Sequence, residues 1–130
     1  MPVCGFDHYN LRAAQPLLDE LRDFYRDVVG LTVGERPPFR RFGYWLYGGE
    51  RPVLHLAEAD PHESRARNVA TTFAHAAFNC NDRAVYERRL EERGIRFRVD
   101  RVPLTNQVQL FFQDPAGNGV ELQFDAVDGA

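Results

Sequence analysis

Apolar and polar positions along the chain follow the same order of patterns twice. Alternation over residues 3–12 predicts a strand, and apolar positions at helical spacing over 15–29 predict a helix. The order recurs with a predicted strand at 72–80 and a predicted helix at 82–94. Three further strands are predicted after each helix, at 31–36, 41–48 and 52–59 in the first half and at 95–102, 107–114 and 119–126 in the second.

This order describes an internal βαβββ repeat. The first module covers residues 1–59 and the second covers 71–128, with a polar loop at 60–70 between them. The sequence therefore predicts an α+β fold, in which two βαβββ modules form a single domain over residues 1–130.

Four ionisable residues stand at matching places in the two modules. His8 in "FDH" aligns with His75 in "FAH", and His55 in "VLHL" aligns with Glu121 in "GVEL". The interval from His8 to His55 is 47 residues, and that from His75 to Glu121 is 46. If a pseudo-twofold axis relates the modules, equivalent positions approach the axis together, and all four side chains face one apolar trough.

Burial of four such groups without partners is costly, and a divalent cation offsets that cost. Neutral imidazole and carboxylate together bind such ions, and three nitrogens with one carboxylate oxygen suit Zn, Fe, Ni, Co, Mn or Cu. The alternative is that hydrogen bonds alone satisfy these residues. The remaining histidine, His62, lies in the polar loop and is expected to face solvent.

Charge and composition exclude several classes of protein. The net charge is −3, which argues against nucleic-acid binding, and no apolar run approaches the length of a membrane span. The first ten residues lack the features of a signal peptide. The two cysteines, Cys4 and Cys80, are predicted to be buried free thiols, which fits a reducing cytoplasm. We expect a cytoplasmic protein whose partner is a small-molecule substrate.

Several segments resemble one protein family: "FDHYNLR", "LRDFYRDVVGL", "PVLHLAEA", "FAHAAFNC" and "DPAGNGVELQF". These are similar to segments of the vicinal oxygen chelate superfamily, which includes glyoxalase I, bleomycin-resistance proteins, fosfomycin-resistance proteins and extradiol dioxygenases. The resemblance implies that the two βαβββ modules form a curved mixed sheet around a metal site, usually in a homodimer.

The resemblance also implies roles for the four residues. The family's ligand positions fall on His8, His75 and Glu121. His55 occupies a fourth position, where glyoxalase I usually has a glutamate that serves as ligand and base, and where extradiol dioxygenases have an acid/base histidine nearby. His55 is therefore predicted to be either a fourth metal ligand or a general base. His55 and Glu121 are the predicted catalytic residues.

These expectations describe a metal-dependent, glyoxalase-like enzyme with isomerase, lyase or epimerase chemistry. One divalent ion (Zn, Ni, Co, Mn or Fe) would chelate two vicinal oxygens of a small substrate and stabilise an enediolate-type intermediate. One alternative is an extradiol-type dioxygenase that uses Fe(II), although Phe111 and Phe112 replace the tyrosine of its signature. Another is a small-molecule binding or resistance protein without catalysis. The sequence leaves open whether one chain or two complete the site.

Overall fold

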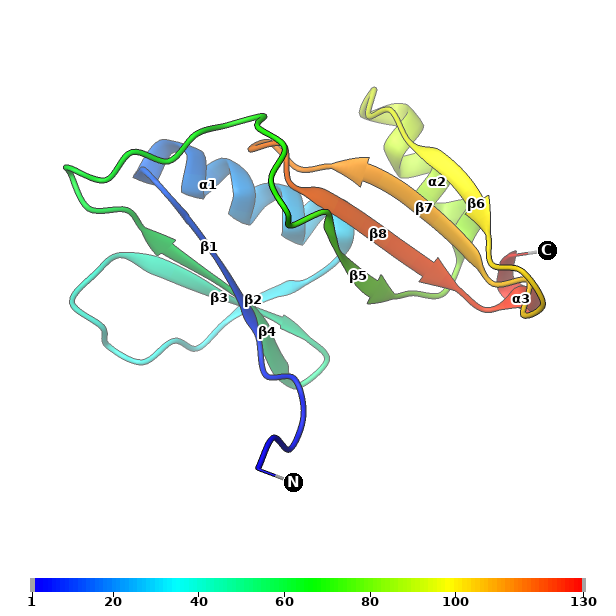
Figure 1. The fold of residues 1–130 in the computed structure, drawn as a ribbon, viewed down its shortest axis with the longest axis horizontal. Helices are drawn as coiled ribbons and strands as arrows, with labels where there is room; N and C mark the ends of the chain where they lie inside the picture. Colours follow the sequence, from blue (N-terminus) through cyan, green and yellow to red (C-terminus); the bar gives the residue numbers. More distant parts are fainter. Residues whose placement is uncertain (1, 130) are drawn as a thin grey trace. The chain divides into compact units, whose positions relative to one another are not determined.

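The computed structural model describes residues 2–129 and divides into two compact units, residues 1–66 and 67–130 (Figure 1). Each unit contains one four-stranded sheet with helical segments after its first strand, and the second unit has a further short helix after its last strand. No helix within residues 2–129 has both the length and the apolar character that a membrane span requires.

The first unit has the predicted βαβββ order. Its sheet has the strand order β1-β4-β3-β2, in which β1 runs parallel to β4 and the other neighbours are antiparallel. The elements are β1 (Tyr9–Ala13), α1 (Gln15–Phe24), the π-helical turn η1 (Tyr25–Val29), β2 (Thr32–Gly34), β3 (Gly43–Gly48) and β4 (Arg51–Glu58).

The predicted helix over 15–29 is confirmed, although its last turn is a π-helix. The N–H groups of Gly30 and Leu31 both donate to the carbonyl oxygen of Tyr25, at 3.0 and 2.9 Å. Gly30 ends the helix at φ 96°, a conformation that a glycine adopts without steric cost. Leu18 and Leu21 bury the apolar face of α1 against the sheet.

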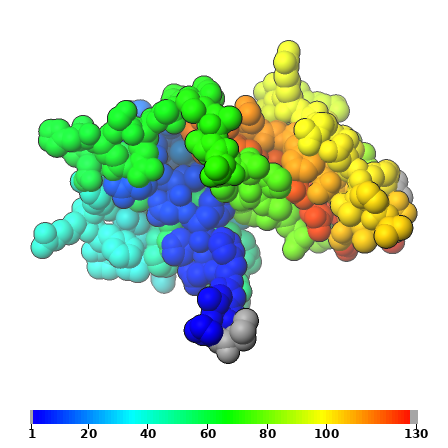
Figure 2. Space-filling model, viewed as in Figure 1, coloured from blue at the N-terminus to red at the C-terminus, as the bar shows by residue number. Residues whose placement is uncertain are grey.

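Strand β1 is shorter than predicted, because residues 2–8 are not in regular structure. Val3 and Phe6 are 76% and 70% exposed, and this segment lies at the surface of the first unit (dark blue in Figure 2). The pairing between β1 and β4 begins at Tyr9 and Leu54. If this pairing continued toward the N-terminus it would reach Pro52 on β4, which has no N–H to donate to the strand ladder.

The second unit repeats this connectivity. Its sheet has the order β5-β8-β7-β6, with β5 parallel to β8 and the other pairs antiparallel. The α+β class and the two βαβββ modules are therefore confirmed. The elements are β5 (His75–Asn79), α2 (Arg83–Glu92), β6 (Arg98–Arg101), β7 (Val108–Gln113), β8 (Gly119–Phe124) and α3 (Ala126–Gly129).

The sequence of α2 predicts that Val85, Tyr86 and Leu90 point inward, and two of the three do. Leu90 is fully buried and Tyr86 packs edge-on against Phe124 at 5.8 Å, whereas Val85 is 47% exposed. Tyr86 and Leu90 are four residues apart and so share one face, which excludes Val85.

The cysteine prediction is only half right. Both residues are free thiols, but Cys4 is exposed, since it lies in the irregular segment before β1. Cys80 is half-buried, and burial raises the pKa of its thiol. The Cys80 thiol is therefore protonated and weakly nucleophilic at neutral pH.

An ion-pair network ties the loop after β4 back to β1. Arg12 donates to the two carboxylate oxygens of Glu63 at 2.6 and 3.0 Å, and Arg65 contacts the same carboxylate. The hydrogen bonds from Arg12 and Arg65 lower the pKa of Glu63 from its ordinary 4.5 to about 2.

This shift predicts a pH-dependent contribution to stability. Because the folded-state pKa of Glu63 is depressed, its contribution is complete above pH 4.5 and is lost as the pH falls from there toward about 2. The melting temperature of Glu63→Gln should therefore lie below that of the wild type at pH 7 and converge with it in acid. The exposed Glu50, in the turn between β3 and β4, provides the matched control Glu50→Gln. A Glu63→Gln deficit that is unchanged at pH 3 would contradict this account.

Candidate metal-binding residues

In the first unit, His55 projects from the sheet face opposite α1. Its neighbours Leu54 and Leu56 are fully buried, and successive strand residues point to opposite faces. On β3, the Tyr44 hydroxyl donates to Asp19 of α1 at 2.7 Å, so the adjacent Trp45 points away from the helix. Trp45 is the register partner of His55 and shares its face.

The imidazole of His55 is stacked between two other rings. The Trp45 ring lies at 4.1 Å with an interplanar angle of 11°, and the His8 ring lies at 3.6 Å with an angle of 14°. Because β4 lies between β1 and β3, these rings approach His55 from opposite sides. The stack leaves His55 only 8% exposed.

Hydrogen bonds assign the tautomers of both histidines. His55 Nε2 is 3.1 Å from the carbonyl oxygen of Pro52, which can only accept, so Nε2 carries the proton and Nδ1 is free to accept one. His8 Nδ1 donates to the Asp7 carboxylate at 2.6 Å, which leaves Nε2 free to bind a metal. The same bond lowers the pKa of Asp7.

Burial lowers the pKa of His55 below its ordinary 6.5, and the nearby His8 and Arg36 lower it further. The Pro52 carbonyl and the Asp7 charge oppose this shift without reversing it. His55 is therefore neutral at physiological pH, the form that a ligand or a general base requires.

In the second unit, Glu121 holds the place that His55 has in the first. Its carboxylate is buried, with Oε1 3.0 Å from His75 Nε2, and Oε2 accepts a hydrogen bond from Gln109 Nε2 at 3.1 Å. His75 also packs edge-on against Phe111 at 5.4 Å.

The strand registers of the two units correspond closely. Trp45 pairs with His55 across β3 and β4, as Phe111 pairs with Glu121 across β7 and β8. Two residues after His8, Asn10 pairs with His55. Two residues after His75, Ala77 pairs with Glu121. The residues that match between the two halves of the sequence therefore also have matching places in the strand pairing of the two sheets.

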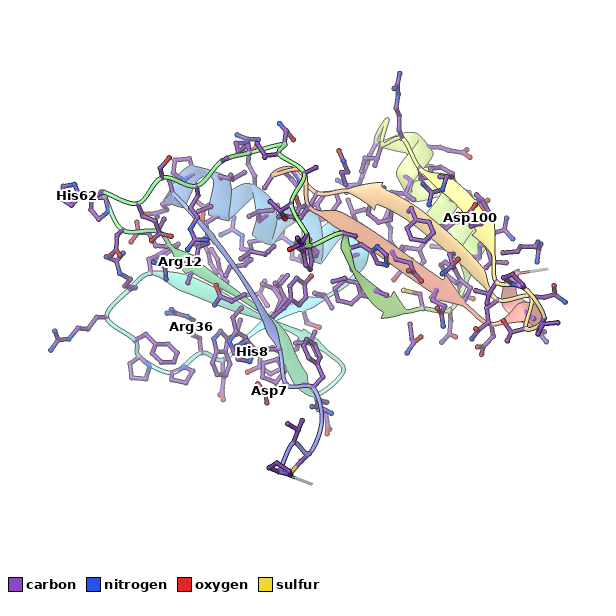
Figure 3. All side chains as sticks on the ribbon, viewed as in Figure 1. Asp7, His8, Arg12, Arg36, His62 and Asp100 are labelled. Carbon is purple, nitrogen blue, oxygen red and sulfur yellow. The ribbon has the colours of Figure 1, made fainter. Side chains whose placement is uncertain are left out.

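The structure brings the four residues together as two pairs, His8 with His55 and His75 with Glu121. Within residues 2–129, no three His, Cys, Asp or Glu side chains form a group that could hold a metal ion. His62 is exposed in the loop after β4, as expected (Figure 3). Sequence reasoning missed Asp7 as the partner of His8, although its position directly before that histidine was a signal.

Each unit has a pocket that is lined by the aromatic residue in ring contact with one member of its pair. In the first unit a pocket of about 450 Å³ is lined by Glu35, Arg36, Pro37, Trp45 and Tyr47. In the second unit a pocket of about 410 Å³ includes His75, Phe111 and Arg98 in its lining. Both pockets therefore combine an arginine with the aromatic residue that flanks the buried ionisable group.

A comparison of the chain with family models identifies its family. Residues 5–122 match the model of the Glyoxalase/Bleomycin resistance protein/Dioxygenase superfamily. The chain belongs to this superfamily. The resemblance seen in the sequence is thus confirmed, and the two repeated βαβββ units are the form that the fold takes here.

Individual members of the glyoxalase superfamily are similar over most of the chain. "Glyoxylase I 4" of Arabidopsis thaliana is 32% identical over 110 residues, which are 81% of this chain and 63% of that protein. The chain thus spans less than two thirds of the curated relative's length. The crystal structure of lactoylglutathione lyase from Agrobacterium tumefaciens matches with a TM-score of 0.66 and 26% identity over the whole of both chains. A putative glyoxalase family protein from Bacillus anthracis matches with a TM-score of 0.71 and 22% identity, covering 95% of this chain and 96% of that one.

Proposed function

We propose that this chain is a metal-dependent, glyoxalase-like enzyme that moves a proton on a small substrate with two adjacent oxygens, as an isomerase, lyase or epimerase. The observation that carries the proposal is the repeated pair of donors. Each unit presents two of them at equivalent positions on the sheet face away from its helix. Superfamily membership and the glyoxalase relatives support the same class of chemistry.

The donor set fits a divalent metal. Two imidazoles and one carboxylate, from His8, His75 and Glu121, suit Zn, Ni, Co, Mn or Fe(II). His8 already has the tautomer that a ligand needs, because Asp7 binds its other nitrogen. A bound ion would withdraw negative charge from the substrate's two oxygens and so lower the barrier to proton loss at the adjacent carbon.

We assign the general-base role to His55. Its Nδ1 is free to accept a proton, while the Pro52 carbonyl and the stack between Trp45 and His8 fix the ring. The ring nitrogen lone pairs of two stacked, nearly parallel imidazoles point in parallel planes, so they do not converge on one metal ion. This geometry favours His8 as the ligand and His55 as the base.

His75 Nε2 donates a hydrogen bond to Glu121 Oε1 before a metal binds. Nε2 and Oε1, 3.0 Å apart, would repel each other without a proton between them. Ligation by both atoms requires the His75 ring to carry its proton on Nδ1 instead of Nε2. Gln109 holds the second carboxylate oxygen and so orients Glu121.

A complete site requires both units, since each carries two of the four residues. We propose that they work as one domain and that the chain acts as a homodimer, in which the units that complete a site come from one chain or from two. Size-exclusion chromatography with light scattering measures the mass. A monomer that retains full metal occupancy would exclude a site shared between chains.

Proton exchange tests the proposed reaction whatever product the enzyme forms. Metal-loaded protein in D₂O is incubated with lactoylglutathione, which is named with the Agrobacterium relative, and with a panel of small 2-hydroxycarbonyl compounds. Deuterium should enter the carbon beside the paired oxygens of at least one compound. His55→Gln should slow this exchange by about 100-fold or more while metal content stays unchanged. Loss of metal from His55→Gln would instead make His55 a ligand. A lack of exchange with every compound and metal would contradict the proposed chemistry.

A second candidate function is small-molecule binding without catalysis. It is favoured by one observation, which is that hydrogen bonds or stacked rings already contact all four residues. Failure to bind any divalent metal, together with saturable binding of a small ligand, would support this candidate over the enzyme.

A further inference from the structure

Arg36, in the loop between β2 and β3, has an unpaired positive charge (Figure 3). Within the part of the chain that the structure describes, its guanidinium forms no ion pair, and its buried Nε has no hydrogen-bond partner. Two other partly buried arginines differ in this respect. Arg12 is paired with Glu63, and Arg83 with Glu87. A buried guanidinium N–H without an acceptor is costly.

The fold holds this guanidinium in place on the functional face of the sheet. Its carbon lies 4.9 Å from the centre of the Phe39 ring, over the ring face. A Cβ at Gly43 would clash with the carbonyl oxygen of Leu56 and would also come within 2.8 Å of Nη2, so the glycine leaves room for the guanidinium. Gly43 is two residues before Trp45 on β3 and therefore lies on the same face.

Arg36 also lines the 450 Å³ pocket of the first unit, together with Trp45 and Tyr47. This volume suits a small molecule. The Trp45 ring that lines the pocket also stacks on His55, the proposed base. Glu35 lines the pocket as well, but its exposed carboxylate forms no ion pair with Arg36 in the described structure.

We propose that Arg36 is an oxyanion subsite, and that the substrate carries a carboxylate or phosphate on an apolar body that packs against Trp45 and Tyr47. A guanidinium binds either oxyanion through two parallel N–H···O hydrogen bonds, which would satisfy its unpaired donors. That the ligand is a substrate rests on the proposed function. The subsite itself is tested by binding alone.

The test uses NMR and three probes of matched shape. Phenylacetate and phenyl phosphate carry the two candidate oxyanions, and phenylacetamide is the neutral control. Trp45 is the only tryptophan in the chain, so its indole N–H gives a single resonance that reports on this pocket. At least one anionic probe should shift this resonance saturably, and phenylacetamide should bind about tenfold or more weakly.

Substitution of the arginine then decides the assignment. Arg36→Met keeps the length of the side chain and should weaken the anionic probe by about tenfold or more. Arg40→Met, which removes an exposed charge from the same loop, should not. The subsite would be overturned if the acid and the amide bound equally, if Arg36→Met bound the anion as wild type does, or if both variants lost the same affinity.

Metal content, measured in parallel, should be the same in Arg36→Met and wild type. A wild-type protein that binds the anion but no metal would retain the subsite and contradict the proposed function.

Discussion

Glu121→Gln is expected to abolish metal binding while the protein keeps its fold. The substitution removes the only carboxylate among the four proposed site residues and leaves a neutral amide of nearly the same shape. The amide oxygen can still accept the hydrogen bond from Gln109, and His75 can change tautomer to keep a partner. The loss of metal affinity should exceed the 10- to 100-fold typical of residues that only support a ligand.

The measurement is isothermal titration of the apoprotein with Zn²⁺ and Ni²⁺, with circular dichroism to confirm the fold. Glu92→Gln, which neutralises an exposed carboxylate at the end of α2 in the same unit, is the matched control and should bind like wild type. Wild-type metal affinity in a folded Glu121→Gln variant would remove this residue from the ligand set.

Leu54→Ala should lower the free energy of unfolding by about 2–5 kcal/mol, because it leaves a cavity in the core. Leu54 is fully buried in the middle of β4, between its register partners Tyr9 on β1 and Leu46 on β3. The same strand carries His55 on its other face, so the core that Leu54 fills also supports the proposed base.

Urea denaturation of both proteins measures this difference. Leu104→Ala is the control, since Leu104 is fully exposed and its truncation should change the free energy of unfolding by no more than about 0.5 kcal/mol. A loss below about 1 kcal/mol for Leu54→Ala would mean that this part of the sheet is not the rigid support described here.

The repeated fold was predictable because local patterns specify it. Helical spacing and Gly30 specified the first helix, and alternation specified the strands around His55 and Glu121. The start of β1 and the inward position of Val85 on α2 were mispredicted because they depend on distant partners. Pro52 lies opposite the segment before Tyr9, and Phe124 selects Tyr86 over Val85.

The candidate site was predictable where it depended on the repeat. Matching spacing in the two halves identified His8, His55, His75 and Glu121. The stack of His55 on Trp45 and the Pro52 hydrogen bond arise from strand pairing and side-chain packing, which no sequence pattern encodes. The basic cluster at 36–41 fits either a solvated loop or an anion-binding patch in the sequence, and only the structure shows that the Arg36 Nε is buried without a partner.

Metal content is the most direct test of the central proposal that His8, His75 and Glu121 hold one ion. Elemental analysis of untagged protein, purified without chelator, should find about one transition metal per chain. Zn, Ni, Co or Mn would favour the glyoxalase-like chemistry, and Fe would favour the dioxygenase alternative. A chain that stays empty even after incubation with each of these metals would contradict the claim and favour binding without catalysis.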